Sequence, residues 1–141
     1  MNIEQTITHA SPEKWTEIEL LPEWDEEFYD VYTAKKFGKW HMLKTLKAQY
    51  KDDPEYQSMI RKEFDVRYNL THPNIVIITD FEDVPGVGLS IITDDVYGHS
   101  LRKLIDEHSV TPAMIEQLRH DLLSAIDYIQ THLDEIIQNI V

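Results

Sequence analysis

Two oppositely charged residues, Lys44 and Glu63, have the types and spacing of a charge-based binding or catalytic site. Lys44 alternates with Met42 and Leu46, which places it on the apolar face of a predicted strand. Glu63 lies on the apolar face of a predicted helix, where an unpaired carboxylate would be costly. The sequence therefore predicts a buried Lys44–Glu63 ion pair across a strand–helix junction. An ordinary pair between Glu63 and Arg67, one helical turn further on, is the alternative.

Both strands and helices are needed to position this pair. Alternating apolar and β-branched residues predict strands, and Asp53 followed by Pro54 is typical of a helix start. The turn at 84–88 predicts a hairpin between two strands that we expect to be central in the sheet. In chain order, the expected elements are strands 15–21, 28–34 and 40–46, a helix from 54 to about 70, strands 75–81 and 89–93, a short helix from Ser100 and a long helix from 112.

The last predicted helix carries more apolar surface than the other elements can cover. Large apolar residues recur every three or four positions from Ile115 to Ile140, and an unbroken helix would be on the order of 45 Å long. The alternative is a break near 130–132 that folds the helix back. We expect the helix Pro112 to Val141 to bind a protein partner or a second copy of the chain, and we expect a dimer.

Several ordered features resemble the N-terminal lobe of a protein kinase domain of the serine/threonine type. They are Lys44 on the third strand, Glu63 in the following helix, the run His72-Pro73-Asn74-Ile75-Val76, and the segment Asp94 to Leu101 after the hairpin. In that family the strand-three lysine holds the ATP phosphates and pairs with a glutamate of helix αC. The resemblance implies an α+β fold: a protein-kinase-like N-lobe with a five-stranded antiparallel sheet and helix αC, followed by a short helix and a long C-terminal helix.

The same resemblance implies where an ATP site and the boundaries of the lobe would lie. It matches Thr93 to the gatekeeper and Asp94 to Val96 to the hinge that would accept adenine. It also implies a kinase-like N-lobe at 1–96, and a hinge with αD-like and αE-like helices at 97–141, within a single domain overall. The kinase-equivalent ATP site consists of Lys44, Glu63, Thr93, Asp94 and Val96.

The segment that matches the glycine-rich loop of kinases departs from the family pattern. Trp24, Glu26 and Tyr29 replace all three glycines, so bulky side chains stand where backbone N–H groups would approach phosphates. The segment 24–31 also carries four acidic residues. Two like charges 4 Å apart repel by roughly 1 kcal/mol in water and about 4 kcal/mol at a protein surface. We therefore expect this site not to function with ATP or magnesium, and we expect no cofactor.

The motifs that carry phosphoryl transfer are absent from the 141 residues. After Ile126-Asp127-Tyr128-Ile129, which is similar to the end of helix αE, a kinase would show His-Arg-Asp and later Asp-Phe-Gly. Without a catalytic base or a magnesium ligand, the chain alone has no means of activating a hydroxyl. We expect no catalytic residue, and the length of the chain suggests a kinase domain that stops before its catalytic loop.

Composition narrows the classes of partner and site. The chain has 13 Lys and Arg against 26 Asp and Glu, a net charge of −13, which disfavours nucleic acid and anionic membranes as partners. It has no cysteine, and its seven histidines lack metal-ligand spacing, so we expect no metal site. The start of the chain lacks the pattern of a signal peptide. We expect a cytoplasmic protein.

The favoured interpretation is a catalytically inactive, pseudokinase-like module with a regulatory or scaffolding role in protein binding. One alternative is a fragment of an active serine/threonine protein kinase that lacks its C-lobe. Another is an acidic protein that binds a basic partner, with the kinase-like order of motifs arising by coincidence.

Overall fold

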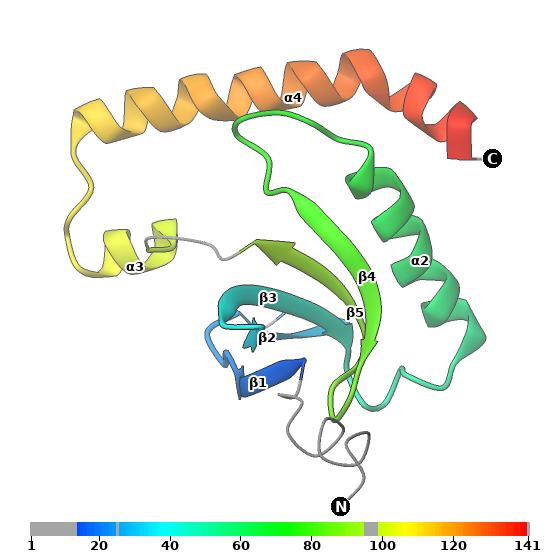
Figure 1. The fold of residues 1–141 in the computed structure, drawn as a ribbon. Coiled ribbons are helices and arrows are strands. Elements are labelled where there is room, and N and C mark those ends of the chain that lie inside the picture. The colour runs from blue at the N-terminus through cyan, green and yellow to red at the C-terminus, as the bar shows by residue number, and fades with distance from the viewer. Residues whose placement is uncertain (1–13, 25, 95–98, 141) are drawn as a thin grey trace, which may run out of the picture.

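A computed structural model describes residues 14–24, 26–94 and 99–140. Its strands form one antiparallel, five-stranded sheet in the order β1-β2-β3-β5-β4, which Figure 1 shows below and beside the helices. This confirms the predicted α+β fold. The strands are β1 (Trp15–Leu20), β2 (Tyr29–Lys36), β3 (Lys39–Leu46), β4 (Ile78–Val84) and β5 (Gly88–Asp94).

The prediction that both strands of the hairpin are central was wrong for β4. β5 lies between β3 and β4, and its Ile91 and Ile92 are fully buried. β4 instead forms an edge of the sheet. Much of the apolar run that suggested a central strand precedes β4, and there Val76 is 44% and Ile77 is 59% exposed. Hydrophobicity alone therefore misplaced this strand.

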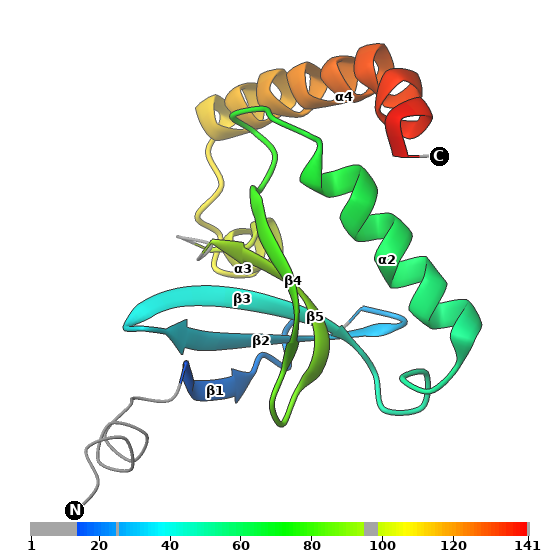
Figure 2. The ribbon, with the colours of Figure 1, turned by 45° about the vertical axis from the view of Figure 1, so that its right-hand side comes forward.

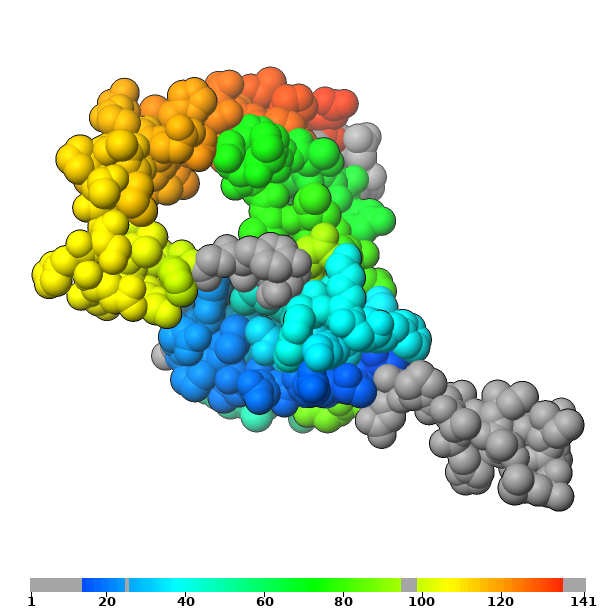
Figure 3. Space-filling view, turned by 60° about the vertical axis from the view of Figure 1, so that its left-hand side comes forward, coloured from blue at the N-terminus to red at the C-terminus, as the bar shows by residue number. Residues whose placement is uncertain are grey.

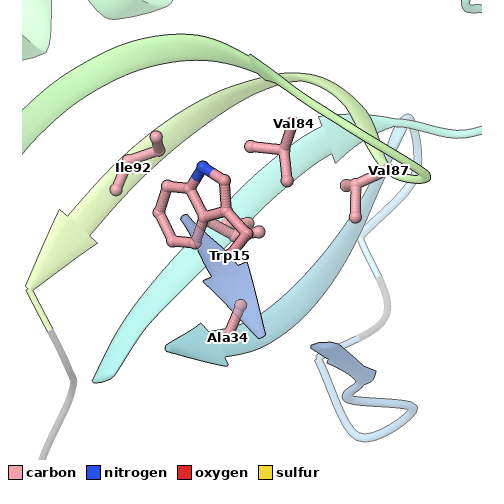
Figure 4. Close-up of a cluster of buried hydrophobic side chains, with 6 residues drawn as sticks. Trp15, Ala34, Val84, Val87 and Ile92 are labelled. Atoms are coloured by element: carbon pink, nitrogen blue, oxygen red, sulfur yellow. The ribbon is translucent and has the colours of Figure 1, made fainter. Parts of the chain in front are cut away.

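Each face of the sheet has its own buried cluster, because successive strand residues point to opposite faces. The cluster in Figure 4 surrounds Trp15 and uses Ile92 from β5. The cluster on the opposite face uses the neighbouring Ile91 and packs against the helix α2 (Pro54–Tyr68). The first cluster consists of Trp15, Ala34, Leu43, Val84, Val87 and Ile92, and the second of Tyr29, Leu46, Ile60, Ile78 and Ile91.

Helix α2 starts as the sequence predicts and packs along one side. The Asp53 carboxylate accepts a hydrogen bond from the Glu55 backbone N–H at 2.9 Å, which satisfies a free donor of the first turn. Ile60 is the fully buried residue of the helix, and Met59 and Phe64 pack beside it. The turned view in Figure 2 shows α2 running alongside β4. This packing fixes which side chains of α2 can reach the sheet.

Two further helices follow the sheet: α3 (Leu101–Asp106) and α4 (Pro112–Ile140). The Ser100 hydroxyl caps α3 by accepting from the Lys103 backbone N–H at 3.1 Å. Helix α4 is continuous, so the alternative with a break near 130–132 was wrong. Over the part of the chain that the structure describes, no helix is both long and apolar enough to cross a membrane.

Helix α4 is attached to the sheet lobe through the segment that follows α2. The Tyr128 hydroxyl accepts a hydrogen bond from the Thr71 backbone N–H at 2.9 Å. The His72 ring lies 3.1 Å from the Ser124 hydroxyl and stacks obliquely on Tyr128, with ring centroids 5.2 Å apart. These polar and aromatic contacts connect the middle of α4 to the segment that follows α2.

Candidate functional site

The predicted ion pair forms between β3 and α2. Lys44 Nζ lies 3.2 Å from Glu63 Oε2, and Arg67 contacts the same carboxylate oxygen at 3.4 Å. Both pairs that the sequence offered as alternatives are therefore present. The side chains of Lys44 and Glu63 are 18% and 28% exposed, so the pair is half-buried rather than buried as expected. Glu63 lies at the edge of the apolar face of α2, whose centre is Ile60.

A second carboxylate lies closer to Lys44 than Glu63 does. Glu26, in the connection between β1 and β2, places its Oε2 2.8 Å from Lys44 Nζ. The sequence predicted that the acidic residues of this segment would repel a phosphate, but it did not predict this contact. One feature of the sequence could have predicted the contact. Glu26 replaces a glycine of the kinase loop pattern, and by the resemblance this loop covers the strand-three lysine. Lys44 is thus paired with two carboxylates of its own chain.

The surroundings of Tyr29 show how these charges act on a neighbouring group. Lys44 Nζ lies over the Tyr29 ring at 4.3 Å from its centroid, a cation–π contact. Burial first, and then the negative charges of Glu63 and Glu26, raise the pKa of Tyr29 to about 12, although Arg67 acts in the opposite direction. An additional negative charge is therefore disfavoured at this position, despite the two cations nearby.

A cavity of about 120 Å³ adjoins the charged cluster. Small-molecule sites usually have volumes of about 300–1,000 Å³, so the space is small for a nucleotide. Trp24 and Glu26, which replace two glycines of the kinase loop pattern, form part of its wall. The lining residues are Trp24, Glu26, Val31, Met42, Lys44, Arg67, Val76, Ile91 and Thr93.

The structure places two of the remaining predicted site residues and leaves one outside the described residues. Thr93 is buried on β5 and lines the cavity, and its carbonyl accepts a hydrogen bond from His41 Nδ1 at 3.1 Å. Sequence reasoning did not single out His41. Asp94 pairs with Lys39 at 3.1 Å at the end of β5. Val96 lies outside the described residues.

The site thus combines a strand lysine, a helix glutamate and an apolar wall with the carboxylate of Glu26 from the connection between β1 and β2. Within residues 14–24, 26–94 and 99–135, no three or more His, Cys, Asp or Glu side chains are grouped so that they would hold a metal ion. Chemically, the cluster neutralises its own charges: Lys44 and Arg67 face Glu26 and Glu63. Glu26 thus contacts the cation that, by the resemblance to kinases, would bind a phosphate.

Sequence comparison finds similarity to bacterial kinases over most of the chain. Serine/threonine-protein kinase PknD of Mycobacterium tuberculosis is 30% identical over 122 residues, which cover 79% of this chain and 18% of PknD. A probable serine/threonine-protein kinase of Streptomyces coelicolor is 30% identical over 105 residues, which cover 70% of this chain and 16% of that protein. The chain thus spans less than a fifth of the length of these curated relatives. None of the family models searched matches the chain.

Comparison with solved structures identifies the same fold. The kinase domain of PknI from Mycobacterium tuberculosis superposes with a TM-score of 0.65 at 22% identity, over 84% of this chain and 48% of that domain. Residues 1–466 of Rad53, in complex with AMP-PNP, superpose with a TM-score of 0.61 at 21% identity, over 91% of this chain and 34% of that one.

Proposed function

Because the chain is a protein kinase-like domain, with the N-lobe fold and with similarity to serine/threonine kinases, we propose that it is a catalytically inactive, pseudokinase-like module with a regulatory or scaffolding role in protein binding. The 2.8 Å contact between Lys44 and Glu26 carries this proposal. The lysine at the position where a kinase binds ATP phosphates already holds a carboxylate of its own chain. A phosphate would have to displace Glu26 and then lie beside the freed charge.

Further features of the chain support the same function. The cavity beside Lys44, at about 120 Å³, is below the usual range for small-molecule sites. Neither ATP nor magnesium belongs to the proposed function. Binding instead involves α4, whose Ile115 and Leu122 are more than half exposed.

A thermal-shift titration of the whole chain with Mg-ATP tests this function. We expect no change in melting temperature up to millimolar nucleotide, because ligands stabilise a fold only by binding it. An active serine/threonine kinase domain, titrated in parallel, serves as the positive control. Saturable stabilisation of this chain at submillimolar Mg-ATP would contradict the proposal.

A second candidate function is that of a part of an active serine/threonine kinase. The Lys44–Glu63 pair, formed at 3.2 Å as active kinases require, favours it, as do the names of the sequence relatives. In this case Glu26 would be displaced when nucleotide binds. Saturable stabilisation in the same titration would favour this candidate over the inactive module, because only this candidate requires binding of Mg-ATP by Lys44.

A further inference from the structure

Helix α4 presents an apolar stripe away from its contacts with the lobe. Ile115, Leu122 and Ile126 are 54%, 52% and 48% exposed. At about 100° per residue they lie within about 40° of one another around the helix axis, so they form one continuous line. Ala125, in contrast, is buried, and Tyr128 bonds to the segment after α2. The stripe is therefore a second face of α4, distinct from the one that holds the helix to the lobe.

An acidic rail accompanies this stripe. We use this name for Glu116, Asp127 and Asp134, which are all exposed. They lie within about 20° of one another and about 100–120° from Ile115 around the helix. Helix α4 as a whole carries five acidic residues and one basic residue, Arg119, for a formal charge of −4. An apolar line with a negative border calls for an apolar partner with a positive border.

A groove between α3 and the start of α4 continues the stripe. It has a volume of about 360 Å³, within the usual range for binding sites, and it shares Ile115 with the stripe. Figure 3 shows α3 and the start of α4, in yellow and orange, with an opening between α4 and the sheet lobe. The apolar side chains of its lining are Leu101, Leu104, Val110, Met114, Ile115 and Leu118.

We propose that the stripe and the groove bind a basic amphipathic helix of another protein. Its apolar face covers the stripe, one large side chain enters the groove, and its Lys or Arg residues lie against the acidic rail. Such helix-in-groove binding uses anchors at i, i+3 or i+4, and i+7 of the bound helix, and the stripe offers it apolar contacts at i, i+7 and i+11 of α4. A second copy of this chain is a poorer occupant, because it would bring another α4 of charge −4 against the first. This inference rests on the proposed protein-binding function and names the class of partner.

Two synthetic helical peptides test the inference with the whole chain. Both carry leucines at the anchor positions; one has lysines along its flanks and the other has glutamates at the same places. Fluorescence anisotropy should show that the lysine peptide binds about tenfold more tightly or better, and that added salt weakens it. Equal binding of the two peptides, or binding of neither, would overturn the proposal.

Matched variants locate the binding surface. Asp127→Lys should weaken binding of the lysine peptide by about fivefold or more, whereas Asp83→Lys, the same charge change on β4, should leave it nearly unchanged. Equal effects of the two variants would contradict the docking site. A dimer in sedimentation velocity that Ile126→Asp abolishes would instead assign the stripe to a second copy. Stabilisation by Mg-ATP would refute the inactive site while leaving the peptide result in force.

Discussion

The Lys44 site and the α4 stripe differ in how far their side chains already have partners within the chain. At the site, Lys44 meets two carboxylates and a tyrosine ring within the same fold. Along the stripe, Ile115, Leu122 and Ile126 are 54%, 52% and 48% exposed. A site whose charges are paired internally gains little from a ligand, whereas exposed apolar surface is stabilised by burial against a partner. The comparison therefore supports the proposal that binding involves α4 rather than the kinase-like site.

Truncating one apolar residue in each region should give the largest contrast in stability. Ile60→Ala removes a fully buried side chain between α2 and the sheet and should cost about 2–5 kcal/mol of unfolding free energy. Leu122→Ala removes a half-exposed side chain of α4 and should change it by less than about 0.5 kcal/mol. Urea denaturation measures both values. Equal costs would show that the stripe is packed in solution and would remove the contrast between the regions.

A smaller effect should come from Glu82 on β4, which makes the unfolding free energy depend on pH. Burial alone would raise the pKa of Glu82. Hydrogen bonds from Lys14 and Trp15, together with the positive charges of Lys14 and Lys36, nevertheless hold its pKa below the usual value of 4.5. Because the folded-state pKa is lowered, this contribution to stability is present above pH 4.5 and is lost as the pH falls below that value. Urea denaturation of the protein and of Glu82→Gln between pH 3 and pH 7 should show a shallower acid loss in the variant. Identical slopes would contradict this role of Glu82.

The sequence predicted features that depend on local spacing. Periodicity placed Lys44 on the apolar face of a strand and Glu63 on the helix that faces it, and the two side chains meet. The capping residues Asp53 and Ser100 also start the helices that they were expected to start. These features follow from neighbours in the chain, which a single sequence displays directly.

The features that sequence reasoning missed depend on tertiary placement. The contact of Glu26 with Lys44 requires the connection between β1 and β2 to fold over β3, which no local pattern specifies. The buried His41 is positioned by the pairing of β3 with β5, through the carbonyl of Thr93. The edge position of β4 likewise depends on the strand order, because an apolar run has the same composition at the centre and at the edge of a sheet.

A double-mutant cycle between Lys44 and Glu26 tests the central claim most directly, namely that the anion bound by Lys44 is a carboxylate of its own chain. Urea denaturation of Lys44→Met, Glu26→Gln and the double variant should give a favourable coupling of about 0.5–1 kcal/mol, as for partly exposed ion pairs. A parallel cycle with Glu27→Gln, an exposed neighbour, should give no coupling. Equal coupling of Lys44 to Glu26 and to Glu27 would contradict the account.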